Sequence, residues 1–221
     1  MTRTERVPKL VVALPKVYPD AHCELDFKTP LQLLVATILS AQCTDKRVNL
    51  VTPALFVRYR SAAAFATAPT AELEKAIQST GFFRAKTKSI RAAAAAIEKD
   101  HAGKVPRTME ELHALPGVGR KTANVVLGNA FQIDEGIVVD THVARLSYRL
   151  GLTKESDAEK IERDLIKLVP KAHWTNWSHW LIWHGRRRCF ARKPDCRNCE
   201  IYDLCPSGKK FIRSGEARPS A

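Results

Sequence analysis

The fold is decided by one stretch of sequence, Leu112-His113-Ala114-Leu115-Pro116-Gly117-Val118-Gly119-Arg120-Lys121-Thr122-Ala123. A helix that opens at Thr108 is expected to stop at the proline, and a second helix to run from about Arg120 to Phe131. Gly117 and Gly119 permit backbone conformations and close approaches that side chains would block. The N–H groups at the start of the second helix then face outward, where they suit one phosphate. This helix–hairpin–helix pattern predicts a sequence-independent grip on a DNA backbone.

Helical patterns fill the rest of the chain. An N-cap at Thr29 precedes a dense apolar run over residues 31–39, and residues 84–99 are rich in alanine without Pro or Gly, so both segments are predicted helices. Capping boxes are expected at Thr108 and Ser156. The β-branched run 137–139 has no partner strand and is expected to be a buried extended connection. The sequence therefore predicts an all-α protein without internal repeats, with a disordered basic tail over residues 209–221.

The composition suits a globular protein that meets a polyanion. Of 221 residues, 45% are apolar, and the formal net charge is +13. Such a surplus speeds encounters with polyanions, so nucleic acid is the first partner to expect and an anionic membrane the second; a merely basic soluble protein is the alternative. The N-terminus lacks the pattern of a secretion signal, and no apolar stretch reaches the roughly 20 residues of a membrane span. We therefore expect an intracellular protein whose clustered cysteines bind metal.

Four cysteines near the C-terminus have the spacing C-x6-C-x2-C-x5-C: Cys189, Cys196, Cys199 and Cys205. Four thiolates can hold one Zn²⁺ ion or one [4Fe–4S] cube. The spacing favours iron–sulfur, because structural zinc sites usually have two close pairs of ligands, but spacing alone leaves both metals open. Arg192 and Lys193 lie in the first loop, where they can grip phosphates if the loop is rigid; solvated side chains are the alternative. A tryptophan at every third position from Trp174 to Trp183 predicts core packing beside this segment.

Two further residues carry candidate chemistry. Lys121 lies just inside the second hairpin helix, where the positive helix end, Arg120 and partial desolvation would disfavour its ammonium form. The free amine can form a Schiff base with a sugar C1′. The alternative, to which the residues give equal weight, is that Lys121 only contacts a phosphate. Asp140 opens the next helix, a position at which most Asp residues are only caps. A catalytic role is favoured because Asp140 occurs in the same chain as Lys121, the hairpin and the cysteines.

In combination these motifs resemble the endonuclease III family, from about Leu25 to Pro206. The resemblance is carried by residues 39–45 (Leu-Ser-Ala-Gln-Cys-Thr-Asp), 115–127, 139–142 (Val-Asp-Thr-His) and the four cysteines. It implies an all-α fold of two helical subdomains with a DNA-binding cleft between them. One is a helical bundle over residues 25–134 with the hairpin at about 108–131. The other is discontinuous, formed by residues 1–24 and 135–221, and bears the iron–sulfur cluster.

The resemblance also implies roles for single residues. Lys121 matches the family's nucleophile and Asp140 its catalytic carboxylate. Gln42 matches the residue that fills the gap left by an extruded base. Phe82 falls where the family often has a leucine that enters the opposite strand, and a phenyl ring can do so by stacking. His113 stands where a family carboxylate can occur, which puts a proton relay through that position in doubt.

The remaining implied contacts are with the cofactor and DNA. The ligands of the [4Fe–4S] cluster would be Cys189, Cys196, Cys199 and Cys205. The DNA contacts would comprise Gln42, Phe82, Gly117, Val118, Gly119, Arg120, Arg192 and Lys193.

The implied activity is that of a bifunctional DNA N-glycosylase and AP lyase of base excision repair. Such an enzyme flips an oxidised pyrimidine out of duplex DNA, removes it through a lysine Schiff base and cuts the strand by β-elimination. The expected partner is duplex DNA with oxidised pyrimidines or abasic sites, bound by a monomer without membrane contact, in a bacterial cytoplasm at the nucleoid. The alternatives are a monofunctional mismatch glycosylase of the same fold, which typically lacks the hairpin lysine, and a non-catalytic DNA-binding iron–sulfur protein.

Overall fold

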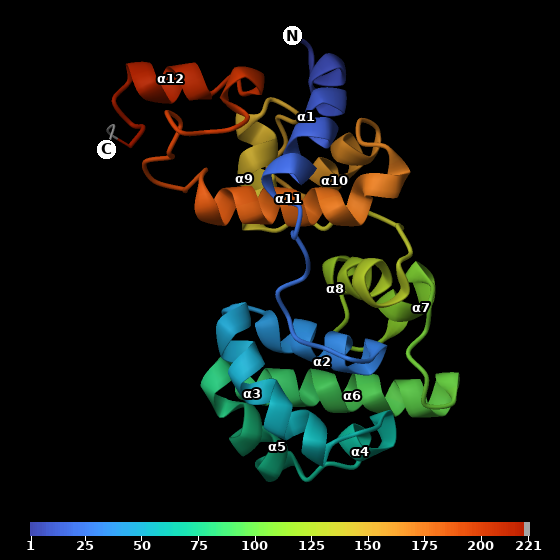
Figure 1. Ribbon diagram of the computed structural model, residues 1–221. Helices are drawn as coiled ribbons and strands as arrows, with labels where there is room; N and C mark the ends of the chain where they lie inside the picture. The colour runs from blue at the N-terminus through green and yellow to red at the C-terminus, as the bar shows by residue number, and fades with distance from the viewer. Residues whose placement is uncertain (219–221) are drawn as a thin grey trace. The chain divides into compact units, whose positions relative to one another are not determined.

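Helices make up the regular structure of the computed structural model, which describes residues 1–218 (Figure 1). No strand occurs among these residues, so the predicted all-α class is confirmed. Their contacts group them into two compact units: residues 23–135, and residues 1–22 together with the chain from Gly136 onward. None of the described helices is long and apolar enough to cross a membrane.

The unit of residues 23–135 carries the hairpin. Its elements are α2 (Pro30–Ser40), α3 (Asp45–Arg58), α4 (Ala62–Ala66), α5 (Thr70–Ile77), η1 (Gln78–Thr80), α6 (Phe83–His101), α7 (Met109–Ala114), α8 (Arg120–Val126) and η2 (Leu127–Phe131). Helix α2 is central, because its residues 33–39 are all buried and it packs against α3, α6 and α8. The apolar core of this unit includes Leu115 and Val118 of the hairpin turn.

Side-chain caps explain where several of these helices begin. Thr29, Thr44, Ser61 and Thr108 each accept a hydrogen bond from the backbone N–H three residues further on. Each bond gives an acceptor to one of the N–H groups that have no partner within the helix at its start. The predicted second hairpin helix is α8, which continues through the π-helical turn η2 to Phe131.

The other unit contains α1 (Arg3–Val17), α9 (Thr141–Arg149), α10 (Ala158–Ile166), η3 (Lys171–His173), α11 (Trp174–Arg187), η4 (Tyr202–Leu204) and α12 (Gly208–Arg213). The run 137–139 is buried, as expected, lies outside any helix or strand, and is separated from α9 only by Asp140. Trp177, Trp180 and Trp183 are buried in the core of this unit, and Trp174 packs half-buried against it. The tryptophan pattern is therefore core packing.

Two predictions about this unit are wrong. Helix α10 is capped by Asp157, whose side chain accepts an N–H of the first turn, rather than by Ser156; the two residues are comparable N-caps, so the helix starts one residue later than expected. The basic tail is not disordered over residues 209–218. Helix α12 lies in it, the guanidinium carbon of Arg149 lies 4.7 Å from the Phe211 ring centre, and Ala217 is buried. Residues 219–221 of the predicted tail lie outside the described chain.

Candidate functional site

The turn of the hairpin depends on two glycines with different roles. Gly117 has a φ of +78°, in the left-handed region, and a Cβ added there would lie 2.6 Å from Cβ of Ser89. Glycine alone meets both demands. Gly119 has an ordinary φ of −86° and is the N-cap of α8, so it offers no side chain to the N–H groups at the helix start. The first turn of α8 therefore has the uncapped start that the sequence predicts.

Lys121 is exposed in the first turn of α8. In the free protein this side chain is therefore accessible to water. Bound DNA would have to exclude the water.

Asp140 is half-buried and caps α9. Its Oδ1 atom accepts the backbone N–H groups of His142 and Val143, each at 2.8 Å. The capping role is therefore present, but these two bonds use only one oxygen of the carboxylate. Burial lowers the pKa of His142, and the charge of Asp140 opposes that shift. Asp140 belongs to the unit that begins again at Gly136, whereas Lys121 belongs to the unit of residues 23–135.

Gln42 and Phe82 occupy two exposed turns of the hairpin-bearing unit. Both have left-handed backbone, with φ values of 52° and 48°, and the side chain of Phe82 is among the most exposed apolar groups, at 66%. This backbone region is uncommon for residues other than glycine, and such outliers gather at functional sites. Both side chains are accessible to a ligand.

The loop that carries Arg192 and Lys193 is held by ion pairs. Arg188 places Nη1 2.9 Å from a carboxylate oxygen of Asp195 and Nη2 2.6 Å from one of Glu200. Arg192 and Lys193 themselves are exposed. The structure thus gives a braced loop with two exposed cations.

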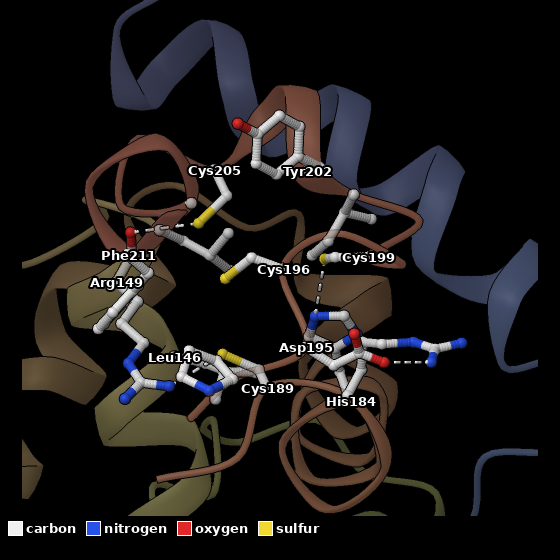
Figure 2. Close-up of a pocket in the computed structure, with 15 residues that line it drawn as sticks. Leu146, Arg149, His184, Cys189, Asp195, Cys196, Cys199, Tyr202, Cys205 and Phe211 are labelled. Carbon is white, nitrogen blue, oxygen red and sulfur yellow. Dashed lines mark hydrogen bonds and ion pairs between the residues drawn. The ribbon is translucent and has the colours of Figure 1, made fainter. Parts of the chain in front are cut away.

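The four C-terminal cysteines line one cavity of about 20 Å³ (Figure 2). The cysteines come from the loop after α11, from the following turn and from the end of η4, and none of them is in a disulfide. Among residues 1–218, no three His, Cys, Asp or Glu side chains converge closely enough to hold a single metal ion. The thiols therefore surround a volume rather than meet at a point. Cys23 and Cys43 are half-buried residues of the other unit and form no disulfide.

Burial raises the pKa of three of these four thiols. It raises the pKa of Cys196 to about 11 and that of Cys199 to about 12, and it also raises the pKa of Cys205. Metal ligation requires thiolates, so loading a metal must displace protons from this pocket.

Two side chains donate to, or lie against, the cysteine sulfurs. Arg149 Nη1 lies 3.2 Å from Sγ of Cys189, and His184 Nε2 lies 3.6 Å from Sγ of Cys199. On its other side, His184 Nδ1 lies 2.8 Å from the hydroxyl of Tyr18. N–H groups that face sulfur are the surroundings that thiolate ligands require, because they offset the ligands' negative charge.

A family model, related sequences and solved structures all relate this chain to one group of proteins. Residues 35–171 match the family described as HhH-GPD superfamily base excision DNA repair protein. An endonuclease III of Synechocystis is 56% identical over 208 residues, which cover 94% of this chain and 95% of the relative. This chain belongs to the endonuclease III family. Members of the endonuclease III family are base excision repair enzymes, and this one is a DNA glycosylase with AP lyase activity.

Solved endonuclease III structures share the fold of nearly the whole chain. A non-covalent endonuclease III–DNA complex matches with a TM-score of 0.90 and 42% identity, covering 96% of this chain and all of that one. A trapped endonuclease III–DNA covalent intermediate matches with a TM-score of 0.91, the same identity and the same coverage. The resemblance expected from the motifs is confirmed.

Several contacts of this endonuclease III family member were not expected from its sequence. Arg149 looks like any basic residue of an amphipathic helix, although it reaches a cysteine sulfur and the carbonyl oxygens of Phe190 and Ala191. Lys86 lies among other cations in an alanine-rich helix, although its side chain is buried. Helical periodicity was the one available signal for Lys86, because its position falls on the buried face of α6.

Proposed function

We propose that this DNA glycosylase and AP lyase removes oxidised pyrimidines from duplex DNA, with Lys121 as nucleophile and Asp140 as catalytic carboxylate. The observation that carries the proposal is the place of Lys121, an exposed amine in the first turn of α8 directly after the hairpin turn. A turn that holds the DNA backbone would bring this amine to the sugar. The solved complexes with DNA, formed by relatives of the same fold, support duplex DNA as the partner.

The proposed chemistry divides into three stages: displacement of the base, opening of the sugar ring and β-elimination. The Lys121 amine forms a bond to C1′ while the bond from C1′ to the base breaks, and the base leaves with the electron pair and takes up a proton. Asp140 stabilises the positive charge that develops on the sugar and accepts the proton that the lysine nitrogen loses. The sugar ring then opens: the C1′–O4′ bond breaks, O4′ takes up a proton, and an iminium forms between C1′ and the lysine nitrogen. This iminium acidifies the C2′ hydrogen. Its removal expels the 3′ phosphate oxygen and cuts the strand.

Gln42 and Phe82 are proposed to fill the space that the extruded base leaves. Their exposed side chains and left-handed turns support this role. Extrusion costs unstacking and unpairing energy, which side chains inserted into the gap offset.

The four C-terminal cysteines are proposed to hold a [4Fe–4S] cluster. A zinc ion would need all four sulfurs about 2.3 Å from one centre, whereas a cube binds one sulfur at each of four separated corners. An all-thiol pocket whose sulfurs surround a volume, with Arg149 and His184 beside them, fits the cube. A bound cluster supplies a rigid cross-link for the loop that presents Arg192 and Lys193.

A trapping experiment tests the nucleophile. The protein is incubated with a duplex that contains one thymine glycol, in the presence of borohydride, which reduces an iminium to a stable amine. Wild type and a matched control at an exposed lysine, Lys75→Ala, should give the covalent adduct, and Lys121→Ala should give none while still binding the duplex. Base release by wild type without an adduct would instead indicate a monofunctional glycosylase. An adduct formed by Lys121→Ala would refute the assignment of the nucleophile.

A further inference from the structure

Lys86 joins two segments of the hairpin-bearing unit that are far apart in sequence. Its side chain is only 5% exposed, and its ammonium Nζ donates to the carbonyl oxygen of Leu39 at 2.7 Å and to that of Thr80 at 2.8 Å. Leu39 lies in the last turn of α2 and Thr80 ends η1. A helix leaves its last carbonyl groups without partners, so one cation from the first turn of α6 completes the ends of two helical segments.

The two carbonyl groups lie directly before the two left-handed turns. Gln42 follows Leu39 by three residues, and Phe82 follows Thr80 by two. Left-handed backbone at residues other than glycine persists only where the surrounding structure fixes it. A bond between Lys86 and each segment, just before its turn, is such a restraint.

Burial of this cation needs a reason beyond stability. Both its hydrogen-bonding partners are neutral carbonyl groups, and burial lowers its pKa, a shift that the half-buried Cys43 opposes. Taking a charge out of water is costly, and an apolar side chain of similar length carries no such cost. An apolar residue at this position would fill the space but would leave the two segments unconnected.

We propose that Lys86 is a positioning residue that sets the spacing of Gln42 and Phe82, and thereby controls extrusion of the damaged base. The inference rests on the proposed duplex contacts of those two residues. Lys86 itself touches neither DNA nor the reacting atoms. Because a displacement of about 1 Å can cost about 100-fold in rate, a small change in this spacing is enough to slow extrusion.

The test compares two substrates on one preparation of Lys86→Met. In the first, thymine glycol is paired with adenine; in the second, the same lesion faces a one-nucleotide gap, so that no pair has to be opened. The single-turnover rate constant for base release is measured on each. With enzyme in saturating excess over the duplex, this constant does not depend on the fraction of protein that is active, so partial misfolding of the variant leaves the comparison valid. Lys86→Gln, which retains N–H donors, is measured in the same way, and Lys99→Met is the control on an exposed lysine of the same helix.

Lys86→Met should lose at least about 10-fold in rate on the paired substrate and stay within about 3-fold of wild type on the gapped one. Lys86→Gln should lie between Lys86→Met and wild type, and Lys99→Met should match wild type on both substrates. Fluorescence of a 2-aminopurine next to the lesion should rise more slowly with Lys86→Met, because that rise reports unstacking. Equal losses on both substrates, or no loss on the paired one, would overturn the inference while the proposed function stands. Failure of wild type to release base from either substrate would overturn both.

Discussion

Arg149 donates a hydrogen bond from Nη1 to Sγ of Cys189 at 3.2 Å, and its guanidinium also binds the next two carbonyl groups of the chain. These are the carbonyl oxygens of Phe190, 2.7 Å from Nη1, and of Ala191, 2.9 Å from Nη2. One planar side chain thus holds the start of the cysteine loop at three points. Removing it should loosen the loop and leave two carbonyl groups without these donors.

Arg149→Met is therefore expected to release iron about 10-fold faster than wild type, since partners of metal ligands typically contribute that much or more to affinity. The visible absorption of the proposed cluster, followed after addition of an iron chelator, measures this rate. Arg163→Met, at an exposed arginine of α10, is the matched control. Equal rates for Arg149→Met and the control would show that the contact with Cys189 contributes nothing to retention.

Substitutions of Asp140 are expected to separate its role as a helix cap from its proposed role in catalysis. Asn is as good an N-cap as Asp, so Asp140→Asn should keep the stability of α9 while losing the charge. Asp140→Ala should lose both, at a cost of about 1 kcal/mol in unfolding free energy. Both variants should lose about 100-fold or more in base release. Urea unfolding and single-turnover assays measure the two quantities, and full activity of Asp140→Asn would reduce this residue to a cap.

The two hairpin glycines should respond differently to alanine. Gly117→Ala forces a side chain into left-handed backbone and against Ser89, so we expect a loss of about 2 kcal/mol in unfolding free energy and weaker DNA binding. At Gly119 the same change meets nothing within 4 Å, and we expect less than about 1 kcal/mol. Adding Ser89→Gly should recover part of the loss at Gly117 but none at Gly119. Equal stability of the two single variants would contradict the assigned steric role.

Acid should destabilise the fold through a half-buried histidine. Burial lowers the pKa of His179 from 6.5 to about 4, with a smaller contribution from His22. Between these two pH values the unfolded chain binds a proton that the folded chain does not, so the unfolding free energy falls as the pH drops from 6.5 towards 4. The shift corresponds to about 3 kcal/mol. His179→Gln should lose less stability than wild type over this range, with a residual slope from His184, whose pKa burial also lowers to about 4. Identical slopes in urea unfolding would exclude His179 as the source.

The helices and the hairpin could be predicted from the sequence because their signals are local. A Thr at a helix start, or two glycines after a proline, acts on neighbouring backbone groups, and the structure confirms the resulting all-α fold. The cysteine spacing likewise led to four thiols that line one cavity. The roles of Lys121, Asp140, Gln42 and Phe82 remain predictions, because they depend on bound DNA.

Contacts between distant segments could not be predicted. Lys86 and Arg149 resemble ordinary surface cations in the sequence, and only the folded chain brings them to carbonyl groups 47 and 41 residues away. The prediction of a disordered tail over residues 209–218 was wrong for the same reason. Its basic composition is typical of disorder, but Phe211 packs against the guanidinium of Arg149, a contact that no local pattern reveals.

Helix α9 begins at the cap Asp140 and ends at Arg149, about 13 Å away along its axis. Arg145, on the same helix, donates to the carbonyl oxygens of Gly185 and Cys189. The proposed catalytic carboxylate and the two arginines that hold the cysteine loop therefore lie on one short helix. A descendant without the proposed cluster could not simply delete the loop, because deletion would leave the buried Arg149 without these acceptors. Such a protein would have to fill the space that the cysteine loop leaves, or replace both arginines, for Asp140 to keep its position.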